Sequence, residues 1–92
     1  MQKFIITSDG LFKYGDVRLH KHLLEAGEHC LGGGFYEFDF VSGRLLLSGS
    51  SYDFGEPRWY DLDALQMPAA FRGLRILYEG EELDKLVKIK YI

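Results

Sequence analysis

The residues with the clearest chemical potential lie in a short run of small and polar side chains, LSGSSYDFG at positions 47–55. Glycines let backbone N–H groups approach a ligand closely, and serine hydroxyls can donate hydrogen bonds to phosphate oxygens. Ser50 and Ser51 therefore predict a cradle for an anion, whereas the carboxylate of Asp53 would repel one. The alternative interpretation is the frayed end of a strand.

Three histidines and the only cysteine also lie close together, at His20, His22, His29 and Cys30. Imidazole titrates near neutral pH, so His20 is a candidate general base or nucleophile, and the alternative is a polar histidine at a strand end. His20 and His22 have a spacing that a strand can present to a metal. No second ligand pair completes the tetrahedral set of a structural zinc site. We therefore expect no metal and no other cofactor.

Several other residues have both a chemical and a structural interpretation. Lys13 is either an anion anchor or a solvated strand lysine, and the glycine triplet at 32–34 is either a nest of N–H groups or a tight entry into a strand. Trp59 and Tyr60 are expected in the core, with an exposed contact patch as the alternative. The structure has to decide between these interpretations.

A hairpin predicted for residues 35–49, FYEFDFVSGRLLLSG, would bring two glycine-rich segments together. Aromatic residues alternate with polar ones, and Ser42-Gly43 suits a two-residue turn. If Val41 and Arg44 flank this turn, the facing pairs are Phe40 and Leu45, Phe38 and Leu47, Tyr36 and Gly49, Gly34 and Ser51, and Gly32 and Asp53. One face of the hairpin is then apolar, and residues 31–34 meet residues 49–55.

The remaining elements are short. A first hairpin or meander is expected within residues 3–19, about two turns of helix at 20–28, and a short helix before Pro68. Residues 74–79 read as a strand, 80–85 as a turn or a single helical turn, and 86–92 as an edge strand whose lysines discourage further pairing. The predicted fold class is α+β: one small domain, residues 1–92, with a mixed or antiparallel sheet of about five to six strands and one or two short helices.

Composition excludes several classes of partner. The 15% aromatic content favours a sheet over a helical bundle, and the net charge of −3 with scattered Lys and Arg predicts no nucleic-acid partner. The apolar runs are too short to span a bilayer, so no membrane is expected. A single cysteine allows no internal disulfide, and the first residues lack the apolar run of a secretory signal. These features predict a cytoplasmic protein.

Three blocks in this order resemble the Janus/Ocnus family, the protein phosphohistidine phosphatases. SDGLFKY, at 8–14, is similar to the family's first-strand signature. CLGGGFYEF, at 30–38, and GSSYDFG, at 49–55, are similar to its central glycine-rich strand and the adjacent phosphate loop. The expected helix followed by LRILYE resembles the family's closing helix and strand. The resemblance covers residues 4 to about 79.

The resemblance implies an α+β fold with a mixed sheet flanked by helices, and metal-free removal of phosphate from protein histidine side chains. It places the family's phosphate-holding lysine at Lys13 and its loop serine at Ser51. Two departures lower the expected phosphate affinity, since Asp53 replaces a small residue and Phe35 replaces a basic one. The predicted catalytic residue is His20, and the predicted phosphate-binding residues are Lys13, Gly34, Ser50, Ser51 and Asp53.

His20 can be matched to the family in two ways, because residues 15–29 are fewer than the family has there. If VRLH replaces the later strand, His20 precedes a helix as the catalytic histidine does. If VRLH finishes the first strand, the catalytic histidine is missing. Strand alternation favours the second match, since Lys13 and His20 then point to opposite faces unless Gly15 introduces a bulge.

Two functions follow as hypotheses. The first is a metal-independent phosphatase acting on phosphohistidine-type side chains. The alternative is a non-catalytic Janus-like module that binds an anion or a protein. The expected partners are a phosphorylated protein or a small anion, and an edge strand offers a route to a homo-oligomer.

Overall fold

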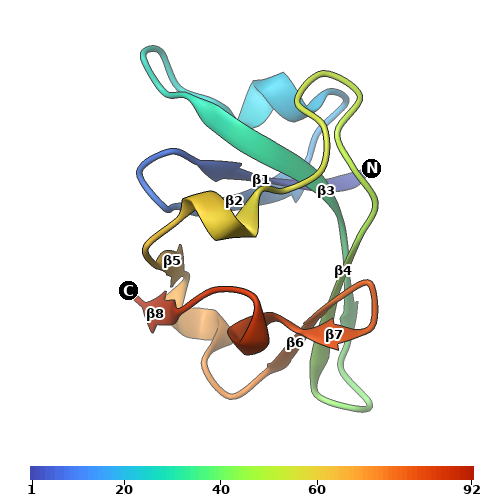
Figure 1. Ribbon diagram of the computed structural model, residues 1–92. Coiled ribbons are helices and arrows are strands. Elements are labelled where there is room, and N and C mark those ends of the chain that lie inside the picture. The colour runs from blue at the N-terminus through green and yellow to red at the C-terminus, as the bar shows by residue number, and fades with distance from the viewer.

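Eight strands form two sheets in the computed structural model, which describes all 92 residues (Figure 1). The large sheet has six strands in the order β2-β1-β3-β4-β6-β7. Its strands are β1 (Gln2–Thr7), β2 (Phe12–Asp16), β3 (Cys30–Asp39), β4 (Arg44–Ser48), β6 (Arg75–Tyr78) and β7 (Glu81–Glu82). All neighbours are antiparallel except β4 and β6, so the predicted mixed sheet and its number of strands are confirmed.

The second sheet is a parallel pair, β5 (Leu65–Met67) and β8 (Ile89–Tyr91). The C-terminal edge strand therefore pairs within the chain. The predicted first hairpin is confirmed as β1 and β2, and the strand at 74–79 is confirmed as β6. These matches hold because short apolar runs are buried in the strands, Phe4 to Ile6 in β1 and Ile76 with Leu77 in β6.

The expected helices are the part of the prediction that is wrong, so the domain is mostly β. The only helical segments are single 3₁₀ turns: η1 (His20–Leu23), η2 (Trp59–Asp61), η3 (Ala69–Phe71) and η4 (Leu83–Lys85). The chain is already extended at Leu24, with φ −86° and ψ 139°. Residues after η2 pair with β8 and bury Leu65 and Met67, so strand pairing overrides helix propensity there.

The hairpin of β3 and β4 forms with a register two residues away from the predicted one. Tyr36 faces Leu47 and Phe38 faces Leu45, because the loop spans residues 40–43. The Asp39 carboxylate accepts a hydrogen bond from the Ser42 N–H at 3.2 Å and pairs with Arg44 at 2.9 Å, which closes this longer loop. A two-residue shift preserves the side-chain alternation, so the apolar face is the predicted one.

The core lies between one face of the large sheet and the segment after residue 56. It is an aromatic and aliphatic cluster in which Phe4 stacks on both Phe12 and Trp59. The predicted core position is confirmed for Trp59 and is wrong for Tyr60, which is 81% exposed. Phe40 is 79% exposed because it lies in the hairpin loop. The buried members of the cluster are Phe4, Ile6, Phe12, Tyr36, Leu45, Leu47, Trp59, Leu65, Met67, Phe71, Ile76, Leu83 and Val87.

The opposite face of the large sheet is covered at one end by η1. A Cβ on Gly15 would lie 3.3 Å from a methyl group of Leu23, so η1 packs directly on β2. Lys13 is two residues before Gly15 and shares this face. The prediction that Lys13 and His20 point to opposite faces is therefore wrong, because the chain leaves the strand after Asp16 and folds back over it.

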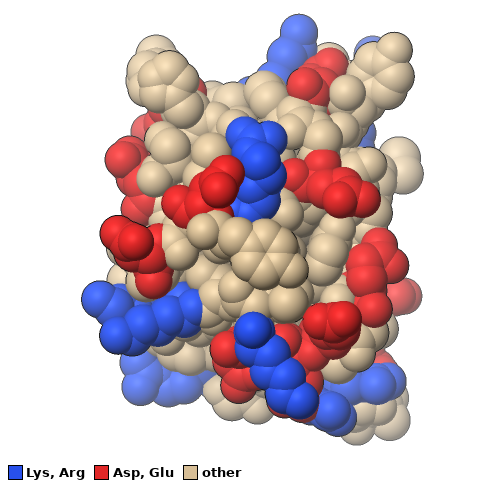
Figure 2. All heavy atoms as spheres, viewed as in Figure 1, with Lys and Arg blue, Asp and Glu red and all other residues tan.

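The surface in Figure 2 carries acidic and basic side chains interspersed over the face in view. None of the helical turns has the length or apolar character that crossing a bilayer requires.

The glycine triplet allows three parts of the chain to approach β3 closely. A Cβ on Gly32 would lie 2.1 Å from the carbonyl oxygen of Glu56, and one on Gly33 would lie 2.3 Å from that of Phe4. A Cβ on Gly34 would lie 2.3 Å from the carbonyl oxygen of Ser48. These distances leave no room for a side chain.

This packing predicts that Gly32→Ala destabilises the fold more than Gly27→Ala. Both glycines have left-handed φ values, +105° and +85°, but only Gly32 has backbone within 4 Å of the added Cβ. Conformational strain alone is expected to cost about 1–2 kcal/mol at Gly27, and the collision should raise the loss at Gly32 to about 3 kcal/mol or more. Urea unfolding of both variants measures the difference, and equal losses would contradict the role given to the triplet.

Candidate functional site

His20 is the buried histidine of the chain, with 5% of its surface exposed. It begins η1 and packs on β3, where its Cδ2 lies 3.2 Å from the position a Cβ on Gly33 would occupy. Its ring also makes an edge contact with Phe35, with the ring centroids 5.4 Å apart. A side chain at position 33 would displace the imidazole, so the triplet creates the space that His20 fills.

The protonation of the His20 ring follows from its hydrogen bond. Its Nε2 lies 2.8 Å from the carbonyl oxygen of Gly34, which can only accept, so Nε2 carries the proton and donates it. Burial lowers the pKa of His20 below the ordinary 6.5, and the charge of Lys3 lowers it further, against the hydrogen bond to Gly34 and the charge of Asp53. His20 is therefore mainly neutral at pH 7, with its lone pair on Nδ1.

Lys3 is a buried cation beside this histidine, with 8% of its surface exposed. Its Nζ donates a hydrogen bond to the carbonyl oxygen of Arg18, and no carboxylate lies within 4 Å of it. Buried ammonium groups are ordinarily paired with an anion, because an uncompensated buried charge is costly. We call Lys3 and His20 the His20 cluster, and the carboxylate of Asp53 acts on the same imidazole without forming an ion pair with Lys3.

The loop at 51–55 closes on itself next to the glycine triplet. Ser51 and Gly55 exchange backbone hydrogen bonds of 3.0 and 2.9 Å, and Ser51 Oγ accepts one of 3.1 Å from the N–H of Phe54. The carbonyl oxygen of Gly55 also accepts from the N–H of Gly33 at 3.2 Å. The predicted meeting of the two glycine-rich segments is confirmed, but through these contacts rather than the predicted pairs.

Hydrogen bonding within this loop leaves little of the predicted phosphate cradle open. The N–H groups of Ser51, Phe54 and Gly55 are all donated inside the loop, and Ser51 is buried. Ser50 and Asp53 are exposed. Gly34 lies within β3, where its carbonyl oxygen accepts the hydrogen bond from His20 Nε2.

Lys13 is neutralised by two glutamates instead of standing open to an anion. Its Nζ lies 2.5 Å from Glu28 and 3.9 Å from Glu25. The hydrogen bond from Lys13 lowers the pKa of the Glu28 carboxyl, which keeps that group charged. Of the two lysines on this face, only Lys3 acts on the pKa of His20.

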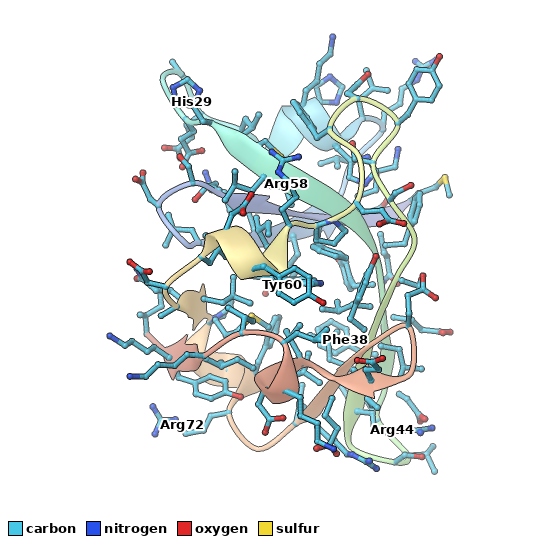
Figure 3. The ribbon with its side chains drawn as sticks, viewed as in Figure 1. His29, Phe38, Arg44, Arg58, Tyr60 and Arg72 are labelled. Carbon is cyan, nitrogen blue, oxygen red and sulfur yellow. The ribbon has the colours of Figure 1, made fainter.

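The other residues of the histidine-rich stretch do not converge with His20. His22 Nδ1 accepts a hydrogen bond from the N–H of Leu19 at 3.3 Å, and Figure 3 shows His29 at the outer end of the loop before β3. Burial raises the pKa of the Cys30 thiol, whose Sγ lies 3.3 Å from the carbonyl oxygen of Gly32. No group of three or more His, Cys, Asp or Glu side chains is arranged to hold a metal ion.

No family model, curated protein or solved structure matches the chain. The resemblance to the Janus/Ocnus family therefore depends on the three sequence blocks alone.

Sequence reasoning missed Lys3, although a signal for it is present. Lys3 precedes the apolar run FIIT, and β1 is flanked by β2 and β3 with both of its faces covered. A lysine in a strand that is covered on both faces is expected to be buried and to have a specific partner for its charge. The order of the strands was needed to recognise that β1 is internal.

The depressed pKa of His20 predicts a loss of stability in mild acid. The unfolded chain binds the proton more tightly, so stability is full above pH 6.5 and falls as the pH drops from 6.5 through the lower pKa of the folded state. His20→Gln keeps an N–H donor without titrating, so its stability should change less between pH 7.5 and 5.5. Thermal unfolding across this range tests the assignment, and parallel pH profiles for both proteins would contradict it.

Proposed function

We propose that this domain binds a small anion of the phosphate class at the His20 cluster, without turning it over. The observation that carries the proposal is that the buried residue Lys3 has no carboxylate within 4 Å of its ammonium group. An anion at Lys3 would supply the missing countercharge, and Nζ has donors beyond the one it gives to Arg18.

Three features argue against turnover. None of the three surface pockets is lined by Lys3, His20 or Ser51. The hydroxyl of Ser51 accepts a hydrogen bond inside its own loop. The carboxylate of Asp53 adds negative charge near His20, where the transition state of phosphoryl transfer would itself be negatively charged. Enzymes that transfer a phosphoryl group need hydrogen-bond donors oriented around that group.

Hydrolysis of phosphohistidine-type side chains is a second candidate, and one observation favours it. The hydrogen bond from Nε2 to Gly34 orients a neutral imidazole with an unprotonated Nδ1 beside the charge of Lys3. A neutral imidazole in this state can accept a proton or a phosphoryl group.

A phosphate titration tests the binding proposal. With phosphate at about ten times Kd the gain in stability should be about 1.4 kcal/mol, and Tm should rise by about 5 °C or more at constant ionic strength. Lys3→Met should abolish this rise and unfold at the same or a higher temperature without phosphate, because it removes an unpaired buried charge.

Lys13→Met is the matched control, since it removes a neighbouring lysine that is already neutralised. It should retain the phosphate effect and lose only the ion pair with Glu28. A phosphate effect that survives Lys3→Met, or that NaCl reproduces, would overturn the proposal.

A turnover assay separates the two candidate functions. We expect no release of phosphate from a phosphohistidine peptide above the spontaneous rate, measured with His20→Gln beside the natural protein. Release by the natural protein that His20→Gln abolishes would replace the binding proposal with the phosphatase.

A further inference from the structure

A surface pocket of about 210 Å³ lies away from the His20 cluster, between η2 and the β6–β7 turn. Three aromatic residues line it, and Figure 3 shows the ring of Tyr60 in the space between η2 and β7. Trp59 forms a buried wall and meets Tyr78 edge to face, with the ring centroids 5.4 Å apart. Tyr60 is 81% exposed and forms a wall open to solvent.

The same pocket carries three glutamates, Glu56, Glu79 and Glu81. None of them has a Lys or Arg within 4 Å, whereas six of the eleven other acidic side chains form ion pairs. Glu79 Oε1 accepts a hydrogen bond of 2.6 Å from the N–H of Gly49, which fixes that carboxylate in place. The pocket is therefore aromatic, acidic and without a countercharge.

Two further observations come from the aromatic walls themselves. Burial raises the pKa of the Tyr78 hydroxyl, and the charges of Glu56 and Glu79 raise it further, so these carboxylates act on the interior of the pocket. The indole N–H of Trp59 is buried and has no acceptor in the chain. A buried indole N–H ordinarily has a partner, so this donor is an exception within the aromatic wall.

We propose that this pocket binds an alkylammonium group, carried by a lysine side chain of a partner protein. Aromatic faces attract cations through the ring quadrupole, and carboxylates beside them add direct attraction. A volume of about 210 Å³ is below that of pockets for drug-sized ligands, about 300–1,000 Å³, and suits a single side chain.

Trp59 is the only tryptophan in the chain and lines the pocket, so its fluorescence reports occupancy directly. The probes are the acetyl, methylamide-blocked forms of lysine, Nζ-trimethyl-lysine and Nζ-acetyl-lysine. The two charged probes should cause a saturable change in Trp59 emission, and the neutral acetyl-lysine probe should not. Equal responses to the acetylated and unmodified probes would overturn the proposal.

Matched variants test the two parts of the pocket separately. Tyr60→Ala should weaken binding of the charged probes about fivefold or more, whereas Tyr60→Phe, which keeps the ring, should retain it. Glu81→Gln should weaken binding, whereas Glu37→Gln, an equal charge change at an exposed position outside the pocket, should not.

Circular dichroism of each variant verifies folding, and Tyr60 and Glu81 are both exposed enough for substitution without loss of core packing. Unchanged affinity in Tyr60→Ala, or equal effects of Glu81→Gln and Glu37→Gln, would contradict the assignment of the site.

Discussion

Close backbone packing at the glycine triplet is the constraint on which the rest of the structure depends. The missing side chain of Gly32 leaves room for the backbone at Glu56, and that of Gly33 leaves room for the imidazole of His20. The carbonyl oxygen of Gly34 accepts the hydrogen bond that orients this imidazole. The chain that crosses Gly32 continues directly into η2, and η2 carries the aromatic walls of the surface pocket. One crowded point on β3 therefore positions both candidate sites.

The two candidate sites have opposite charge, and each lacks an internal countercharge. The His20 cluster contains a buried ammonium with only a carbonyl acceptor, whereas the surface pocket contains three carboxylates without a nearby cation. Some other charges in the chain are paired, as in Lys13 with Glu28 and Arg44 with Asp39. Unpaired charges beside organised side chains are typical of places where a protein meets a ligand.

Local patterns predicted the parts of the fold that depend on side-chain alternation. The apolar face of the β3–β4 hairpin follows from residues that alternate across a strand, and β1 and β6 follow from short apolar runs. The exact register did not, because the carboxylate of Asp39 closes a four-residue loop that competes with the expected Ser42-Gly43 turn. The expected helices failed because pairing of β5 with β8 outweighs weak helix propensity over so few residues.

The sequence by itself determined that the chain makes a sheet with an aromatic core, and that the glycine triplet lies next to the loop at 51–55. These outcomes depend on alternation and on residue size, which are local properties. Only the tertiary structure decided that Lys13 is neutralised and Lys3 is buried unpaired beside His20, and that Trp59, Tyr60 and Tyr78 share a pocket with three glutamates. Burial and charge pairing depend on which strands become neighbours, and that order is set by packing between residues far apart in the chain.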